Sequence, residues 1–191
     1  DAIYRHFTRR GSRVIALGYR WLERVDRSSV KSLHREDVER DLEFAGFLVL
    51  HCPLKPDAVE SLRQLADSAH RCVMITGDNP LTAVHVAEEV DIVTRQTLIL
   101  DHHANRAENE LIWRATDDIT SMDQDANGEL HRRLFDEYDI CVTGTALRVL
   151  EDQPEKLKEL VHNTVVYARV SPAQKELILH TLRDLGYIML M

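Results

Sequence analysis

Residues 72–83 read Cys-Val-Met-Ile-Thr-Gly-Asp-Asn-Pro-Leu-Thr-Ala, and this stretch decides the fold. Cys72 to Ile75 is a short apolar run, which predicts a buried strand. The polar segment from Thr76 to Asn79 predicts a loop, and Pro80 stands where proline favours the first turn of a helix. We expect that helix to reach about Val90. The stretch is therefore a strand–loop–helix unit, the element from which parallel sheets are built.

The same alternation continues on both sides of this unit. Short apolar runs predict further strands at Phe44 to His51, around Ile99, Leu111 to Arg114, Ile140 to Val142, Val165 to Ala168 and Tyr187 to Met191. Capped or amphipathic segments predict helices at Asp57 to about Ala69, Ala146 to Leu150 and Pro172 to Leu185. In the first of these helices, Val59, Leu62 and Leu65 lie on one face. Strands that alternate with helices predict an α/β fold, a parallel sheet covered by helices on both faces.

The N-terminal part and one internal segment have a different character. The pattern predicts a helix from Ala2 to Arg10, ended by Gly11, then a strand from Arg13 to Tyr19 and a short helical stretch around Arg35 to Asp41. Residues 108–139 contain ten acidic and three basic residues. We therefore expect an acidic insertion at about residues 101–139, with a solvated centre.

The composition is that of a folded globular protein, with 44% hydrophobic and 29% charged residues in a chain of 191. A formal net charge of −8 at pH 7 argues against a nucleic-acid partner, because phosphate backbones require a basic face. The longest apolar runs, such as Gly46 to Leu50, are far shorter than a membrane span. Cys52, Cys72 and Cys141 are widely spaced, which predicts reduced core thiols in a cytosolic compartment.

Polar residues follow two of the predicted strands at the point where each strand ends. Ligands of an open parallel sheet bind at that edge, where the next helices begin. After the first strand, Thr76 offers a hydroxyl donor and Gly77 lets the backbone approach a phosphoryl oxygen near a helix N-terminus. After the second, Arg169 follows directly and Lys175 stands in the next helical turn, a point charge suited to a phosphoryl group. Because a strand–Thr-Gly-Asp–helix unit is also a common capped turn, spacing alone leaves both interpretations open.

The motifs, taken in order along the chain, resemble those of P-type ATPases. Residues 74–83 resemble the Thr-Gly-Asp-Asn signature, and Tyr-Ala-Arg-Val-Ser-Pro-Ala-Gln-Lys at 167–175 resembles the family's Phe-Ala-Arg-Val-x-Pro and its lysine. Cys-Pro-Leu-Lys at 52–55 stands where many members have Asp-Pro-Pro-Arg, the hinge between the nucleotide and phosphorylation domains. Gly-Ser-Arg-Val-Ile-Ala-Leu at 11–17 resembles the closing stretch of the nucleotide domain. The match covers nearly the whole chain.

The subgroup is indicated by two further stretches. Residues 47–55, Phe-Leu-Val-Leu-His-Cys-Pro-Leu-Lys, and residues 79–87, Asn-Pro-Leu-Thr-Ala-Val-His-Val-Ala, resemble most the type-five P-type ATPases of subgroup A. That subgroup also has cysteine in place of the first hinge aspartate. The resemblance implies an ATP-driven dislocase that removes misinserted transmembrane helices from the endoplasmic reticulum membrane, with this segment on the cytosolic side. The sibling subgroup of polyamine exporters has a different hinge and ranks lower.

The resemblance also implies a domain division and roles for single residues. Residues 1–51 would be the C-terminal remnant of a nucleotide-binding domain, and residues 52–191 an incomplete haloacid-dehalogenase-like, Rossmann-like phosphorylation domain. The implied catalytic residues are Thr76 and Lys175, and the implied nucleotide- or phosphate-binding residues are Gly77, Asp78, Arg169 and Lys55, the last in place of the hinge arginine. ATP and Mg²⁺ would be the cofactors, with the Mg²⁺ ligands mostly elsewhere. The partners would be the other domains of the parent transporter and its transmembrane-helix substrate.

Two motifs of the family are not in this sequence. The phosphorylated aspartate lies in Asp-Lys-Thr-Gly-Thr, and the Mg²⁺ ligands lie in Gly-Asp-Gly-Thr-Asn-Asp, which would begin shortly after Met191. We therefore expect a part of a longer protein that alone neither autophosphorylates nor hydrolyses ATP. Two alternatives stay open: a soluble haloacid-dehalogenase-like phosphatase, which shares the threonine and the lysine but not the hinge, and a non-enzymatic fragment that only binds nucleotide or a partner domain.

Two segments have some character of a metal site, and we predict surface loops at both. Asp123 to Gly128 copies the opening of an EF-hand loop, but Leu134 occupies the twelfth position, where a bidentate glutamate is required. Asp101-His102-His103 has no cysteine or glutamate at ligand spacing.

Overall fold

The computed structural model describes residues 2–22, 29–102, 111–116, 121–123 and 128–190. The strands are β1 (Arg13–Tyr19), β2 (Glu43–Leu50), β3 (Met74–Ile75), β4 (Thr97–His102), β5 (Leu111–Ala115), β6 (Ser121–Asp123), β7 (Asp139–Thr143) and β8 (Thr164–Ala168). The helices are α1 (Ala2–Thr8), α2 (Arg35–Val38), α3 (Ala58–Asp67), α4 (Pro80–Glu89), α5 (Gly128–Glu137), α6 (Gly144–Leu150), α7 (Pro154–Asn163) and α8 (Pro172–Asp184), with a 3₁₀ turn at Ser29–Ser32.

The body of the molecule is a six-stranded sheet with the strand order β3-β8-β7-β4-β5-β6. Strands β3, β8, β7 and β4 are parallel, whereas β5 is antiparallel to β4 and β6 is antiparallel to β5. The register places Met74 beside Val166 and Val142 beside Tyr167. The predicted α/β class, an incomplete haloacid-dehalogenase-like Rossmann sheet, is confirmed, and the antiparallel strands β5 and β6 extend it.

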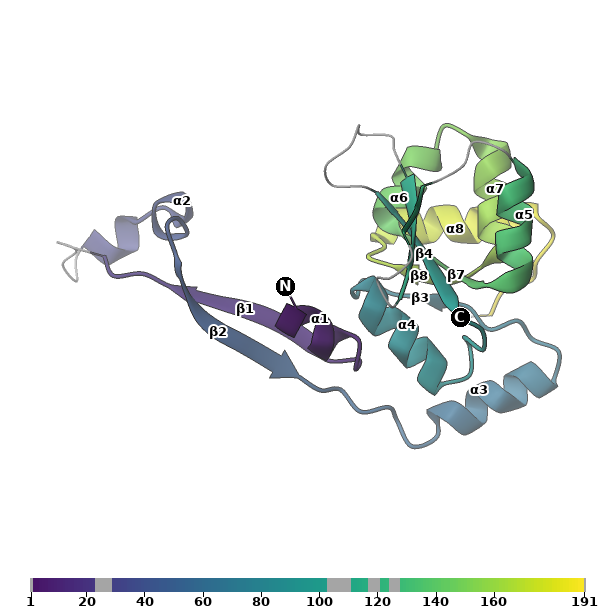
Figure 1. Cartoon of the computed structure of the whole chain (residues 1–191), viewed down its shortest axis with the longest axis horizontal. Helices are drawn as coiled ribbons and strands as arrows, with labels where there is room; N and C mark the ends of the chain where they lie inside the picture. Colours follow the sequence, from purple (N-terminus) through teal and green to yellow (C-terminus); the bar gives the residue numbers. More distant parts are fainter. Residues whose placement is uncertain (1, 23–28, 103–110, 117–120, 124–127, 191) are drawn as a thin grey trace.

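Helices cover both faces of this sheet, as predicted, and two cores result. Leu98 and Leu100 of β4 pack into the core that α6, α7 and α8 share, whereas Ile99 between them packs into the core beneath α4. This alternation follows from the period of two in a strand. Trp113 of β5 is 1% exposed, so the segment with the acidic composition also supplies buried apolar residues. Figure 1 shows α4 on one side of the sheet and the other three helices on the opposite side.

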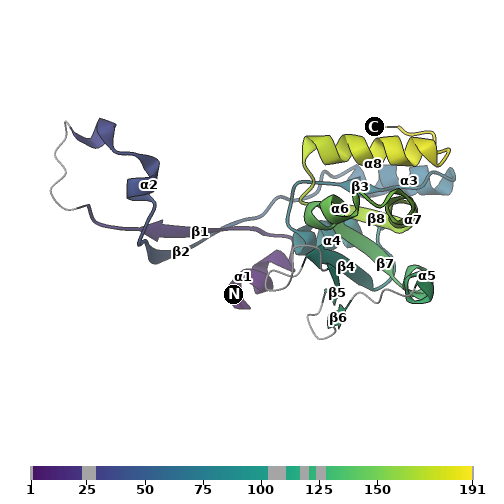
Figure 2. The same ribbon diagram turned by 90° about the horizontal axis from the view of Figure 1, so that it is seen from above.

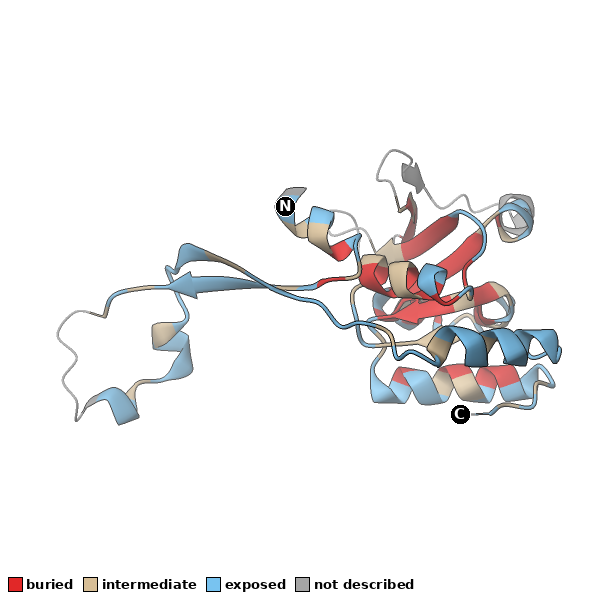
Figure 3. Ribbon diagram, turned by 90° about the horizontal axis from the view of Figure 1, so that it is seen from below, coloured by how far each residue is buried: buried red, intermediate tan, exposed pale blue. Residues whose placement is uncertain are grey.

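A second sheet consists of β1 and β2, which form an antiparallel two-stranded ribbon. Figures 1 and 2 show this ribbon projecting away from the six-stranded sheet. Its apolar side chains are exposed, among them Phe44 (64%), Leu17 (46%) and Leu48 (43%), and Figure 3 shows the ribbon in the colour of exposed residues. A lone two-stranded hairpin is marginally stable in water, so this apolar surface is suited to contact with further protein.

The C-terminal prediction was wrong. Residues 187–190 form no strand, and Ile188 is 98% exposed. The edge strand β3 has two residues and therefore offers few backbone groups to a new neighbour. The segment instead lines an elongated groove together with α3 and α8.

Helix α3 also differs from the prediction, because none of its residues is buried. Val59 and Leu65, on the predicted apolar face, are 37% and 40% exposed. Leu62 and Leu65 line the groove beside β3 and do not join the core. The sequence therefore identified the apolar face of α3 correctly. It could not show that the described residues leave this face partly exposed to solvent.

Two helices, α5 and α7, were missed from the sequence. Helix α7 begins with Pro154 at its first turn and buries Leu157, Leu160 and Val161. This i, i+3, i+4 spacing is the ordinary signature of a helix face, so the signal was present.

Candidate functional site

The polar residues singled out from the sequence lie at the carboxyl edge of the parallel strands. Thr76 follows β3 directly, and Arg169 follows β8 directly. The neighbouring strand β7 ends at Thr143, and β4 carries Asp101 one residue before its end. This is the edge at which ligands of open α/β sheets bind.

The loops after β3 and β8 are joined by backbone hydrogen bonds. The Arg169 amide donates to the Asp78 carbonyl oxygen at 3.0 Å, and the Val170 amide donates to the Thr76 carbonyl oxygen at 3.1 Å. The Thr76 amide in turn donates to the Tyr167 carbonyl oxygen at 2.9 Å. The fold therefore brings Arg169 next to Thr76 and Asp78, which precede it by about ninety positions in the sequence.

The loop after β3 is held by hydrogen bonds between its own residues, and part of it is exposed to solvent. The Asp78 amide donates to the Thr76 hydroxyl at 3.1 Å, and that hydroxyl donates to the Asp78 carboxylate at 3.1 Å. Asn79 caps α4 by accepting from the Leu81 amide at 2.9 Å. Gly77 is exposed, and a Cβ placed there would meet no atom within 4 Å. The backbone at Gly77 is therefore accessible to a ligand as large as a phosphoryl group.

Arg169 adopts a backbone conformation that non-glycine residues seldom use, with φ at 53°. Such a residue costs of order 1 kcal/mol or more and persists only where its surroundings enforce it. Here the amides of Arg169 and Val170 both donate hydrogen bonds to the loop after β3, as described above. Arg169 is an exposed residue, and it lies directly after β8 at the edge of the site.

Lys175 lies in the first turn of helix α8, which begins shortly after Arg169. Its amide donates to the Ser171 carbonyl oxygen at 2.9 Å, and its side chain is exposed. Lys175 and Ile75, the residue before Thr76, both line the groove of about 580 Å³ that runs along β3. Lys175 and the last residue of β3 therefore border the same groove.

Lys55 is not tied to this group by any contact among the described residues. It is exposed on the connection between β2 and α3, where its carbonyl oxygen accepts from the Ala58 amide at 3.1 Å. Its predicted place near the phosphates stays a prediction.

Sequence reasoning missed a third polar cluster on the same edge. One carboxylate oxygen of Asp101 accepts from the Thr143 hydroxyl at 2.8 Å, the Thr145 hydroxyl at 2.9 Å and the His102 amide at 2.9 Å. The available signal was Thr143-Gly144-Thr145, a second strand–Thr-Gly–helix unit. Burial, with a smaller effect of the Asp101 charge, raises the pKa of the nearby Cys141 thiol well above its usual value. This cysteine is therefore an inert core thiol, as predicted. The same prediction was wrong for Cys52, which is exposed on the connection between β2 and α3.

The prediction of a surface loop at Asp101-His102-His103 was wrong for Asp101 and His102, which are half-buried at the end of β4, and His103 lies outside the described residues. Within the described ranges, no three His, Cys, Asp or Glu side chains gather as they would around a metal. The calcium-loop-like stretch from Asp123 to Gly128 lies partly outside the described residues, and no helix in the described part is long and apolar enough to cross a membrane.

Comparison with known proteins agrees with this architecture. The sequence profile of the haloacid dehalogenase-like hydrolases matches residues 3–103, more than half of the chain. The chain belongs to this family. The matched residues include β3, α4 and β4 of the body, and the resemblance noted from the motifs points to the P-type ATPase branch.

Three relatives specify the resemblance further. The endoplasmic reticulum transmembrane helix translocase of Saccharomyces cerevisiae is 51% identical over 100% of this chain, and that of Schizosaccharomyces pombe is 46% identical over 100%. A probable manganese-transporting ATPase of Arabidopsis thaliana is 39% identical over 96% of the chain. The predicted resemblance to the ATPases of the endoplasmic reticulum is thereby confirmed. The chain spans only 15 to 16% of the length of these relatives.

Proposed function

We propose that this chain is a phosphate-handling part of an ATP-driven membrane transporter that works through an aspartyl-phosphate intermediate. The observation that carries the proposal is the joining of the Thr76 and Arg169 loops by two backbone hydrogen bonds, with Lys175 in the following helical turn. In this proposal residues 52–191 belong to the phosphorylation domain and residues 1–51 to the nucleotide-binding domain. The apolar surface of the β1–β2 ribbon then contacts the rest of that domain.

The chemistry of the site is electrostatic and positional. The Thr76 hydroxyl donates to a phosphoryl oxygen in place of the Asp78 carboxylate, and the open backbone at Gly77 admits that oxygen. The Lys175 ammonium offsets the charge that spreads over the phosphoryl oxygens during transfer. Asp78 and Arg169 contact the nucleotide or its domain, and Lys55 reaches the phosphates when the domains close. Mg²⁺ would neutralise phosphate charge from ligands elsewhere in the parent.

We propose further that the parent moves transmembrane helices out of the endoplasmic reticulum membrane, with this chain on the cytosolic side. The two fungal relatives named as transmembrane helix translocases, at 46 to 51% identity, support this substrate more strongly than the manganese-transporting relative at 39% supports a cation. ATPase activity of the purified parent that Mn²⁺ stimulates, and that a membrane-spanning peptide does not, would favour the cation instead.

A soluble phosphatase is the second enzymatic candidate, and the length of the matching relatives argues against it. Each relative described above is about six times longer than this chain, as coverage of 15 to 16% requires. In addition, the sequence has no Asp-Lys-Thr-Gly-Thr segment, so we expect the isolated chain to form no phosphoenzyme and to hydrolyse no ATP.

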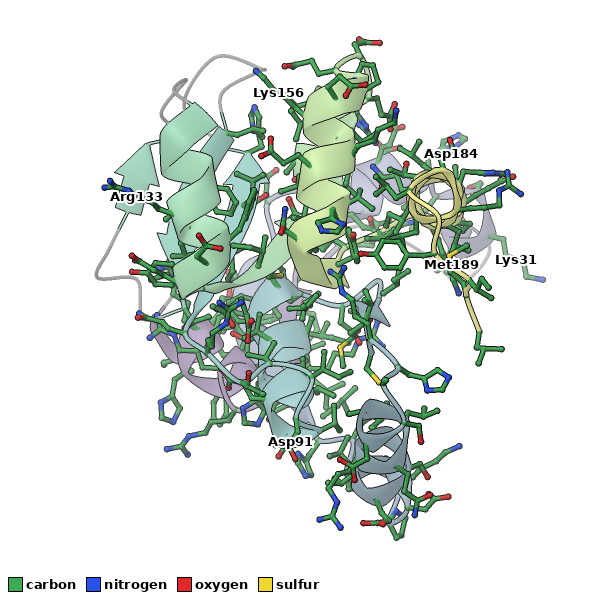
Figure 4. The ribbon with its side chains drawn as sticks, turned by 90° about the vertical axis from the view of Figure 1, so that its right-hand side faces the viewer. Lys31, Asp91, Arg133, Lys156, Asp184 and Met189 are labelled. Atoms are coloured by element: carbon green, nitrogen blue, oxygen red, sulfur yellow. The ribbon has the colours of Figure 1, made fainter. Side chains whose placement is uncertain are left out.

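The test uses the full-length protein and [γ-³²P]ATP. Lys175→Ala is expected to lower the rate of phosphoenzyme formation by about 100-fold or more, and Thr76→Ala by about 10-fold, because each removes a group that stabilises the transferred phosphoryl. Lys156→Ala is the matched control, since Lys156 is an exposed lysine of α7 whose side chain points into solvent (Figure 4). Equal rates for Lys175→Ala and Lys156→Ala would rule out the proposed role.

A further inference from the structure

A buried carboxamide lies directly before Lys175 in the sequence. Gln174 is 7% exposed, and both ends of its side chain are bonded. Its Nε2 donates to the Gly144 carbonyl oxygen at 2.6 Å, and its Oε1 accepts from the Ser171 amide at 3.1 Å. The Ser171 hydroxyl completes a capping box by accepting from the Gln174 amide at 3.3 Å. Gln174 thus ties the start of α8 to the start of α6.

The contact between these two helix starts leaves no free space. A Cβ built at Gly144 would collide with the Arg169 carbonyl oxygen and lie 2.6 Å from Gln174 Oε1. The first residue of α6 therefore packs directly against the turn that holds Arg169 at φ 53°. The surroundings that enforce this unusual conformation are the Thr76–Asp78 loop on one side and Gly144 with Gln174 on the other.

Gln174 also sits where it can set the direction of its neighbour. Consecutive residues of a helix point about 100° apart, so a buried Gln174 fixes the rotation of the first turn and leaves Lys175 exposed toward β3. A lysine has a flexible stem of four carbons, and the position of its Cα therefore decides which region its ammonium can reach. If the turn rotates, the ammonium moves with it.

We propose that Gln174 is a positioning residue of the phosphate site, which holds the Arg169 turn and presents Lys175 to the Thr76 loop. This inference rests on the proposed function. Gln174 touches no ligand in this role, and it acts through the hydrogen bonds to Gly144 and Ser171. Its loss therefore lowers the rate of phosphoryl transfer while the affinity for ATP, which other residues determine, stays nearly unchanged.

The experiment compares phosphoenzyme formation by the full-length wild-type protein with that by Gln174→Leu. Leucine keeps most of the volume and removes both hydrogen bonds. We expect the rate at saturating ATP to fall about 10-fold, equivalent to 1.4 kcal/mol, and the KM for ATP to change less than about threefold. Gln153→Leu is the matched control, because Gln153 precedes the first turn of α7 and makes no side-chain cap hydrogen bond. A wild-type rate for Gln174→Leu overturns the proposal.

A second variant keeps the test decisive if Gln174→Leu does not fold. Gln174→Glu retains the acceptor for the Ser171 amide and, when protonated, also has a donor for the Gly144 carbonyl oxygen. Its ionised form has no donor and is repelled there, so its rate relative to wild type is expected to rise as the pH falls. A ratio independent of pH between 6 and 8.5 overturns the proposal. No phosphoenzyme from the wild-type protein would contradict the proposed function itself, whereas normal wild-type activity with unaffected Gln174 variants would contradict this inference alone.

Discussion

Two turns of this molecule have nearly the same local sequence and different surroundings. Ile-Thr-Gly-Asp at 75–78 and Val-Thr-Gly-Thr at 142–145 both begin at the end of a parallel strand, at the same edge of the sheet. Gly77 lies in a loop before α4, whereas Gly144 is already the first residue of α6. Gly77 is exposed, and a Cβ built there would meet no atom within 4 Å, whereas Gly144 is buried against Arg169 and Gln174. The first turn can admit a ligand, and the second is part of the packing that supports it. A strand–Thr-Gly–helix pattern alone therefore does not identify a binding loop.

The largest expected difference between the two turns is in the reactivity of the cysteine that precedes each of them. Cys141 of β7 is 0% exposed with a raised thiol pKa, whereas Cys72 before β3 is half-buried. We expect iodoacetamide to alkylate Cys141 at least about 100-fold more slowly than Cys72 in the native chain, because only an opening of the core exposes it. Peptide mass spectrometry after timed quenching gives both rates.

The pH dependence provides the control for that experiment. Burial raises the pKa of the Cys141 thiol, so raising the pH to 9 should leave Cys141 a neutral and slowly alkylated thiol in the folded chain. Rates that converge at neutral pH in the absence of denaturant would show that β7 is no more protected than β3.

Adding one methyl group to each glycine breaks the comparison directly. Gly144→Ala is expected to destabilise the chain by about 1–3 kcal/mol, because its Cβ collides with the Arg169 carbonyl oxygen and with Gln174. Gly77→Ala should change the free energy of unfolding by less than about 0.5 kcal/mol, since its Cβ enters open space. Urea unfolding followed by circular dichroism measures both. Equal destabilisation would mean that the two turns are packed alike.

The two threonines allow a smaller test of the same kind. Thr143 is fully buried, caps α6 through the Ala146 amide at 3.3 Å and donates to Asp101. Thr143→Val should therefore cost about 1–2 kcal/mol of stability. Thr76→Val should cost less than about 0.5 kcal/mol, because its partner Asp78 is exposed. The same unfolding assay applies, and a larger loss for Thr76→Val than for Thr143→Val contradicts the assignment of roles.

The smallest expected effect concerns the support of the open turn. The side-chain amide of Asn79 donates to the Tyr4 hydroxyl at 2.8 Å and so links α1 to the start of α4. Tyr4→Phe removes this half-buried bond and should cost about 0.5–1.5 kcal/mol. Hydrogen exchange should also increase at the amides of α1, and unchanged exchange there would show that the bond does not hold the helix.

Much of the fold was accessible from the sequence because apolar runs and helix caps are local. The runs at Cys72 to Ile75, Ile140 to Val142 and Val165 to Ala168 became β3, β7 and β8, and Pro80 and Pro172 begin α4 and α8 as predicted. The C-terminal run failed because a strand also needs a partner backbone, and β3 offers only two residues. Thr76, Gly77, Asp78 and Arg169 lie at the edge of the sheet where the sequence places them, and Lys175 lies in the first turn of α8, whereas their roles in binding stay predictions. Gln174 was missed: Ser-x-x-Gln at 171–174 is a local capping-box pattern, but it does not show that the glutamine is buried against Gly144.

The sequence by itself determined most strands and helices of the parallel sheet, the sheet edge at which polar residues gather, and the family resemblance. These depend on periodicity, on turn chemistry and on motifs that lie within ten or so neighbouring residues. Only the tertiary structure decided which of the two Thr-Gly turns is open, why Arg169 can keep a φ of 53°, and which side chain ties the start of α8 to the start of α6. Those properties arise where Gly144, Arg169 and Gln174 meet, and contacts between residues distant in the chain are fixed by packing.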